Sequence, residues 1–196
     1  MSADPWSIAP TLAGRFIALR PTTMADADGL AAAFDDPDAL QYFLRGPESQ
    51  APSADTVRHA LASGRQVLTQ FDPATGRIVG TTSLYNMSAE HGRVTIGFTW
   101  LSASVRGGAV NSESKLLLLQ HVFQTLGAAR AEFNVDDQNL RSRGAVLAIG
   151  ATEEGVLRSH ARRRDGSRRN TVVYSVLAAE WPAVRDGLQQ RIRARG

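Results

Sequence analysis

The sequence predicts a mixed α/β (α+β) fold in which helices flank one central sheet. Two strand-like segments, 66–71 and 77–85, are separated by a turn with proline and glycine, which indicates an antiparallel hairpin. A strand at 93–101, a helix over 112–126 and a short strand at 131–136 then follow as a strand–helix–strand unit. Helices, antiparallel strands and one such unit in a single chain are typical of a mixed sheet.

The strand at 93–101 and the following helix are predicted from the spacing of their apolar residues. Two-residue alternation places four side chains on one face of the strand: Val94, Ile96, Phe98 and Trp100. Spacing of three to four residues places four others on one face of an amphipathic helix: Leu116, Leu119, Phe123 and Leu126.

The first third of the chain is expected to carry one strand and two helices. Prolines and a glycine within residues 1–14 indicate an irregular lead-in, and alternation at 15–20 predicts a strand that Pro21 ends. Hydroxyl residues favour helix starts at 22–23 and at Ser53, so we expect one helix through Phe34 and a second up to Gly64. Residues 41–52 are predicted to form a loop or a short helical turn.

The last third is expected to alternate between helices and strands. A helix is predicted over 139–148, two strands at 156–164 and 170–177, and a C-terminal helix in 179–196. With 196 residues and 43% hydrophobic residues, and with no linker or repeat, residues 1–196 are predicted to form a single domain.

The loop before the helix at 112–126 has the composition of a phosphate-binding loop. Residues 106–111 contain one arginine and two glycines and open onto a helix N-terminus. Such a terminus presents backbone N–H groups without helical partners, and the positive end of the helix dipole. The sequence therefore predicts that a phosphorylated cofactor binds here.

Composition excludes some chemistries and makes others improbable. The chain has no cysteine, so thiolate and disulfide chemistry are excluded. A reducing cytoplasm fits this and is the expected location, although a chain without cysteine fits any compartment. We find no apolar run of membrane-spanning length and no secretory pattern at the N-terminus, so no membrane partner is expected. No His, Asp or Glu spacing suggests a metal.

Arginine dominates the basic residues, because Lys115 is the single lysine among 22 Lys and Arg. Six arginines cluster within residues 158–169 and could attract nucleic acid or an anionic cofactor, or could simply be a solvated hairpin. This stretch lacks interleaved aromatic residues and any nucleic-acid-binding signature, so a nucleic-acid partner is not expected.

Three stretches, in this order and spacing, resemble the GNAT superfamily of acyl-CoA-dependent N-acetyltransferases. They are residues 77–84, residues 106–115, and the segment with Asn139, Ser142, Gly150 and 154–158. The chain is most similar to the branch around RimJ and RimL, which acetylates protein N-termini. The resemblance implies a mostly antiparallel sheet of about seven strands, splayed between the fourth and fifth and flanked by helices.

The resemblance also implies a role for each matching residue. The backbone of Trp100 and Leu101 would pair with the pantetheine arm of acetyl-CoA, Asn139 would bind the same arm, and Ser142 would lie near the thiol as the catalytic candidate. The pyrophosphate would be held by N–H groups of six consecutive residues: Arg106, Gly107, Gly108, Ala109, Val110 and Asn111.

The chain departs from the family pattern at three positions. Ala109 replaces a usual glycine, and its methyl group could crowd the pyrophosphate. Asn111 could bind cofactor, cap the helix, or do both. Val146 stands where many members place a tyrosine that protonates the thiolate, which leaves Ser142, unless that serine is hydrogen-bonded to its own helix backbone.

No residue is clearly the general base. The candidates are His160, Glu113, Asp136 and Asp137, and a water relay without a single base also fits the sequence. The resemblance places Tyr42, Phe43, Tyr85 and Met87 along the acceptor groove, although packing would explain each of them equally well.

The sequence therefore supports two possible functions. The first is transfer of an acetyl group from acetyl-CoA to a primary amine, at a protein or peptide N-terminus or on a small molecule, by direct transfer in a ternary complex. The alternative is a non-catalytic acyl-CoA-binding or degenerate GNAT module, suggested by Ala109, by Val146 and by Ala161, which stands near the position where RimL-like enzymes can carry an acid. A homodimer is plausible, as in many relatives.

Overall fold

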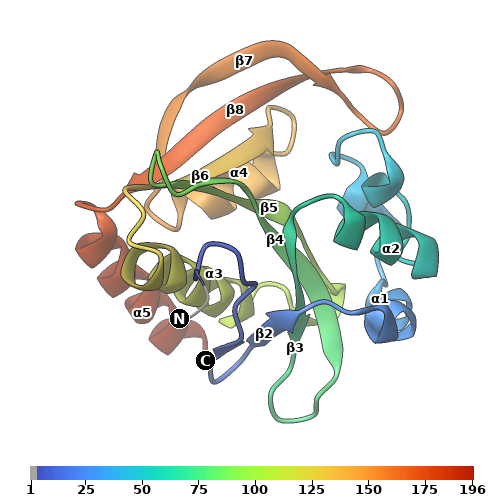
Figure 1. The fold of residues 1–196 in the computed structure, drawn as a ribbon, viewed down its shortest axis with the longest axis horizontal. Helices are drawn as coiled ribbons and strands as arrows, with labels where there is room; N and C mark the ends of the chain where they lie inside the picture. The colour runs from blue at the N-terminus through green and yellow to red at the C-terminus, as the bar shows by residue number, and fades with distance from the viewer. Residues whose placement is uncertain (1–3) are drawn as a thin grey trace.

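The computed structural model describes residues 4–196, which form one sheet with helices on both sides (Figure 1). Within those residues the sheet has eight strands in the order β1-β2-β3-β4-β5-β6-β8-β7. The strands are β1 (Leu12–Ala13), β2 (Ala18–Pro21), β3 (Gln66–Phe71), β4 (Ile78–Ser88), β5 (Arg93–Leu101), β6 (Arg130–Asp136), β7 (Thr152–Arg162) and β8 (Arg168–Leu177). Every neighbouring pair is antiparallel except β5 and β6, which are parallel.

Five α-helices accompany the sheet in the described residues. They are α1 (Ala27–Ala33), α2 (Ala54–Ala62), α3 (Val110–Gln120), α4 (Leu140–Leu147) and α5 (Trp181–Arg195). A π-helical turn, His121–Thr125, extends α3. In Figure 1, α3 and α5 lie on one side of the molecule and α1 and α2 on the other. No helix in the described part of the chain is long and apolar enough to cross a bilayer.

The predicted splay lies between β5 and β6. These strands are paired only at their starts, where residues 93–95 face residues 130–132. Beyond this point β5 stays paired with β4 as far as Leu101, and β6 stays paired with β8 as far as Asp136. The two strands therefore separate toward their carboxyl ends and leave backbone groups unpaired along the gap.

A bulge in β5 makes the predicted alternation wrong. Phe98 has a φ of 50°, and the register shifts so that Gly97 faces Ser83 while Trp100 faces Thr81. One extra residue in β5 reverses the side-chain direction beyond it. Trp100 consequently packs away from the main core, with Leu30 and with Phe34, whose ring it meets edge-on at 5.4 Å. Val94 and Ile96 remain in the main core.

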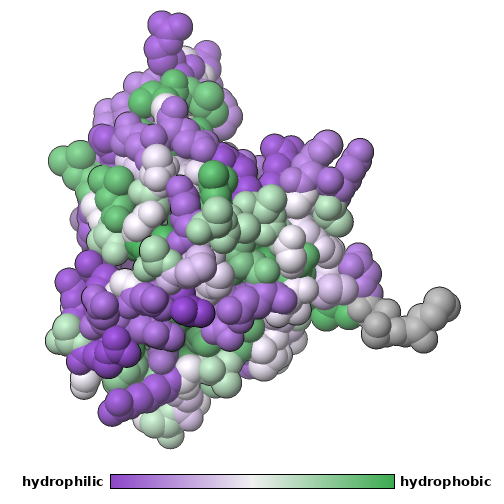
Figure 2. All heavy atoms as spheres, turned by 90° about the vertical axis from the view of Figure 1, so that its left-hand side faces the viewer, coloured by the Kyte–Doolittle hydropathy of each residue, from purple (hydrophilic) through white to green (hydrophobic). Residues whose placement is uncertain are grey.

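Helix α3 is covered on more than one face, which differs from the predicted amphipathic pattern. Leu118 and Leu119 are fully buried, and the polar residues of its first turns are buried as well: Ser112, Glu113, Ser114 and Lys115. Helix α5 covers the outer side of α3, with the rings of Phe123 and Trp181 5.6 Å apart. Figure 2 views the molecule from the α5 side and shows hydrophobic patches separated by hydrophilic side chains.

The lead-in predicted as irregular contains a short strand instead. Leu12 and Ala13 pair with Leu19 and Ala18 as β1, and Ser53 caps α2 as predicted by accepting the N–H of Thr56 at 3.3 Å. Residues 1–3 of the predicted lead-in lie outside the described residues.

Candidate active site

A cleft of about 1350 Å³ lies where β5 and β6 separate. Residues 96–101 of β5 and 133–136 of β6 form facing walls, and the first residues of α3 and most of α4 line the remainder. The cleft therefore runs from the start of α3, along the unpaired edge of β5, to an aromatic end beyond the bulge.

The loop at the start of α3 leaves a run of backbone N–H groups free. Among the described residues, no hydrogen bond engages the N–H groups of residues 107–112, and the first engaged group is that of Glu113, which donates to the Ala109 carbonyl at 2.9 Å. A Cβ added to Gly107 or Gly108 would meet no atom within 4 Å, so the space beside these N–H groups is open. The arrangement has the capacity to bind an anion.

The helix cap differs from the expectation for Asn111. Helix α3 begins at Val110 with Ala109 as its N-cap, so Asn111 is the second helical residue and does not cap the helix. Ala109 is 3% exposed and does not line the cleft, as Val110 does not. The methyl group of Ala109 therefore does not crowd the space beside the loop.

Arg106 supports the loop. Its Nε donates to the Leu101 carbonyl at 2.8 Å, and its guanidinium forms an ion pair with Asp36. Its own N–H donates to the Ala103 carbonyl at 3.2 Å, so the run of free N–H groups starts at Gly107. Six of the residues predicted to bind the cofactor line the cleft around this loop: Trp100, Leu101, Arg106, Gly107, Gly108 and Asn111.

Helix α4 supplies the opposite wall of the cleft. Asn139 caps this helix, its Oδ1 accepting the N–H of Ser142 at 3.0 Å, and both residues line the cleft. The hydroxyl of Ser142 forms no hydrogen bond with any residue that the structure describes, so it is not spent on its own helix backbone. Val146, also in the wall, is 5% exposed and cannot donate a proton.

Three of the four candidate bases are committed to structural contacts. Glu113 is buried and accepts the N–H groups of residues 15, 16 and 17 at 2.9, 2.6 and 2.9 Å. Asp136 accepts from Nε and Nη2 of Arg163 at 2.7 and 2.9 Å. Asp137 pairs with the same guanidinium at 2.8 Å, and a hydrogen bond from Asn170 lowers the pKa of its carboxyl group.

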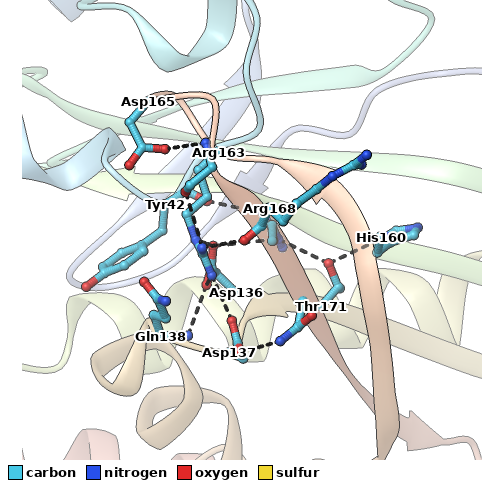
Figure 3. A network of polar contacts seen from close by, with 12 residues as sticks. Tyr42, Asp136, Asp137, Gln138, His160, Arg163, Asp165, Arg168 and Thr171 are labelled. Carbon is cyan, nitrogen blue, oxygen red and sulfur yellow. Dashed lines mark hydrogen bonds and ion pairs between the residues drawn. The ribbon is translucent and has the colours of Figure 1, made fainter.

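His160 is the remaining candidate, and it lines the cleft. Its Nδ1 lies 3.1 Å from Oγ1 of Thr171. Figure 3 shows Arg163 directed at Asp136. Arg163 and Arg169 are 7% and 6% exposed, so part of the arginine cluster stabilises the fold and is not available to nucleic acid.

Aromatic residues form the far end of the cleft. All four residues that the resemblance placed along the acceptor groove line it: Tyr42, Phe43, Tyr85 and Met87. The Phe98 ring meets those of Phe43 and Tyr85 edge-on at 6.1 and 5.1 Å, and the Arg65 guanidinium lies 3.8 Å above it. Burial raises the pKa of Tyr85.

Sequence reasoning assigned no role to Lys115, which also lines the cleft. It is 6% exposed, its Nζ donates to Thr99 Oγ1 at 3.1 Å, and burial lowers its pKa to about 8. The available signal was its position one helical turn after Asn111, as the single lysine in an arginine-rich chain.

Comparison with known proteins identifies a fold and a family. The family model of the acetyltransferase (GNAT) domain matches residues 17–152. A candidate acetyltransferase from T. thermophilus is 34% identical, with a TM-score of 0.83 over 95% of this chain and 99% of that chain. A GCN5-related N-acetyltransferase from Brucella melitensis is 26% identical, with a TM-score of 0.82 over 93% and 85% of the two chains. RimJ from Mycobacterium smegmatis, solved with CoA-disulfide, shares the fold at 22% identity, with a TM-score of 0.78 over 95% and 96%. No curated protein matches the chain.

Proposed function

Because the chain belongs to the GNAT acetyltransferase family, we propose that it transfers an acetyl group from acetyl-CoA to a primary amine by direct transfer in a ternary complex. The proposal rests mainly on one observation, that a cluster of free N–H groups and an unpaired strand edge line the same cleft. Free N–H groups at residues 107–112 lie at one end, and the unpaired edge of β5 leads from them to the aromatic end.

The residues around the cleft fit coenzyme A. The pyrophosphate would be held by N–H groups of residues 107–111, with Arg106 bracing the loop through Leu101 and Asp36. The pantetheine arm would pair with backbone groups of Trp100 and Leu101, and with the side-chain amide of Asn139. Since the Oδ1 of Asn139 already caps α4, its Nδ2 is the group that is free to donate.

Positioning of the two reactants supplies much of the acceleration in such a reaction. Bound acetyl-CoA supplies an activated thioester. The hydroxyl of Ser142 lines the cleft without a partner among the described residues, and it would donate a hydrogen bond at the reacting end. His160 is the side chain best placed to accept the proton that the amine loses, directly or through water, because the three candidate acids are engaged elsewhere.

We propose an N-terminal amine of a protein or peptide as the acceptor, and a small amine as the next candidate. This choice rests on the resemblance to the RimJ and RimL branch and on the open, aromatic end of the cleft, where Tyr42, Phe43 and Tyr85 gather. A homodimer and a cytoplasmic location stay predictions.

Two measurements test the proposal. Calorimetry should show binding of acetyl-CoA at micromolar to millimolar concentration, and the absence of binding at millimolar ligand would remove the premise. Release of coenzyme A should be detected with a panel of peptides and small amines. A Ser142→Ala variant should lower that rate by about tenfold to a hundredfold while it still binds acetyl-CoA.

The non-catalytic alternative is favoured by one observation, the apolar Val146 in the cleft wall where many relatives have a tyrosine. It predicts binding of acetyl-CoA without release of coenzyme A for any acceptor. Turnover with any peptide or amine of the panel would exclude it.

A further inference from the structure

Lys115 is a buried cation in the cleft, and it has no anionic partner within residues 4–196. Its ammonium group carries three donors, yet its one hydrogen bond within the described residues goes to Thr99 Oγ1. The two carboxylates that line the cleft are already paired, Glu48 with Arg65 at 3.1 Å and Asp136 with Arg163 at 2.7 Å. A buried ammonium group whose N–H groups lack acceptors destabilises the folded protein unless a ligand supplies an acceptor.

The position of Lys115 along the cleft indicates which part of a ligand it meets. The bulge at Phe98 directs Thr99 toward α3, and Lys115 reaches it from the helix turn that follows the free N–H groups. Nζ consequently lies between the anion-binding loop and the aromatic end. An arm that ran from the loop along Leu101 and then Trp100 would reach Thr99 next, so Nζ of Lys115 would lie beside that arm.

We propose that the Lys115 ammonium contacts the sulfur of bound coenzyme A and gives it a proton as the acetyl group leaves. This inference rests on the proposed function. The acceptor nitrogen forms a bond to the carbonyl carbon, the carbon–sulfur bond breaks, and its electron pair stays on sulfur. Nζ then transfers a proton to sulfur, and the neutral lysine regains one from the proton that the acceptor nitrogen loses through water. One proton leaves nitrogen and one reaches sulfur, so the reaction balances.

The chemistry of the site suits this role. Val146 stands where many relatives have a tyrosine that protonates the thiolate, and it cannot donate a proton. The hydroxyl of Ser142 can hydrogen-bond to sulfur but is a weak acid. Burial brings the pKa of Lys115 to about 8, close to the ~8.5 of a cysteine thiol. Proton transfer between groups of similar pKa is efficient. Desolvation by burial is the cause of that shift.

The pKa of the thiol in bound coenzyme A tests the contact without requiring an acceptor. The chain has no cysteine, so thiolate absorbance in the ultraviolet reports on the ligand, and the protein alone is titrated in parallel to subtract its three tyrosines. A cation beside sulfur should lower the thiol pKa by about one unit or more in the unchanged protein relative to Lys115→Met. Equal thiol pKa values, with both proteins binding coenzyme A, would overturn the inference.

Two further variants separate charge from proton transfer. His160→Gln removes another titratable group of the cleft and should leave the thiol pKa unchanged; a shift that depends on His160 and not on Lys115 would contradict the assignment. Lys115→Arg keeps the charge but does not release a proton. With the acceptor that gives the fastest release of coenzyme A, Lys115→Arg should lower kcat about tenfold or more and change KM for acetyl-CoA little. An unchanged kcat would exclude protonation by Lys115.

Calorimetry keeps this inference apart from the proposed function. If the unchanged protein fails to bind coenzyme A, the proposed function fails. If it binds and the thiol pKa does not depend on Lys115, the inference alone fails.

Discussion

Glu113 Oε2, in the first turn of α3, accepts the backbone N–H of Phe16 at 2.6 Å. The same carboxylate also accepts the N–H groups of Arg15 and Ile17, both at 2.9 Å. The segment before β2 is thereby attached to the helix whose start forms the anion-binding end of the cleft. Glu113 is a structural residue, although its sequence position made it a candidate base.

Replacing Glu113 should therefore destabilise the protein strongly. Glu113→Ala would leave three N–H groups without their acceptor, at about 1–3 kcal/mol for each group that stays buried. Glu113→Gln keeps one carbonyl acceptor and should cost less. Urea unfolding of the two variants measures the difference, and a Glu113→Ala variant as stable as the unchanged protein would contradict this role.

The pair of Asp136 and Arg163 should be strongly coupled. Arg163→Met would leave the Asp136 carboxylate, 1% exposed at its side chain, without its guanidinium, and a broken buried pair costs about 3–5 kcal/mol. The double variant Asp136→Asn, Arg163→Met should recover part of this loss, because residue 136 then carries no charge that lacks Arg163, while Arg169, whose Nε lies 3.9 Å from Asp136 Oδ2, keeps its own charge. A double-mutant cycle in urea gives the coupling, and additive losses would show that the two side chains act independently.

The burial of Lys115 should appear as a pH-dependent stability. Its pKa is lowered by burial from 10.5 to about 8, so between these values the unfolded chain binds more protons than the folded chain. The contribution of this group to the free energy of unfolding therefore rises with pH across that window, by up to about 3 kcal/mol. Lys115→Met removes it.

Unfolding of the unchanged protein and of Lys115→Met should thus be compared at several pH values from 7 to 10.5. The free energy of unfolding of Lys115→Met minus that of the unchanged protein should be largest at pH 7. This difference should shrink as the pH rises, because the unchanged protein gains stability. A difference that is constant with pH would show that Lys115 has an ordinary pKa in the folded protein.

The sequence was sufficient for the family and the fold class, and both are confirmed. Local signals were enough to predict the β3–β4 hairpin and the β5–α3–β6 unit. Their apolar periodicity and turn residues lie within one continuous stretch of sequence. The splay was expected from the resemblance and lies at the predicted strands. In residues 4–196 the sheet has eight strands where about seven were expected. The extra strand, β1, was not predicted, because Leu12 and Ala13 are too few residues to show a periodic pattern.

Features that depend on distant contacts were not predicted. The bulge at Phe98 leaves no mark in the apolar alternation of residues 93–101, yet it reverses the direction of Trp100. The burial of Glu113 and Lys115 depends on partners in the lead-in segment and in β5. The buried face predicted for α3 was therefore too narrow. Periodicity shows where the apolar residues of a helix lie, but it does not show which other segments cover its polar residues.

Binding of acetyl-CoA to two matched variants at Gly108 tests the central claim most directly. The backbone of Gly108 lies outside the left-handed region and a Cβ there meets no atom within 4 Å, so both Gly108→Asp and Gly108→Asn should fold. If residues 107–112 hold a diphosphate, the added carboxylate should weaken binding about tenfold or more relative to the isosteric amide, as measured by calorimetry. Equal dissociation constants for the two variants would contradict the claim that this loop binds the cofactor.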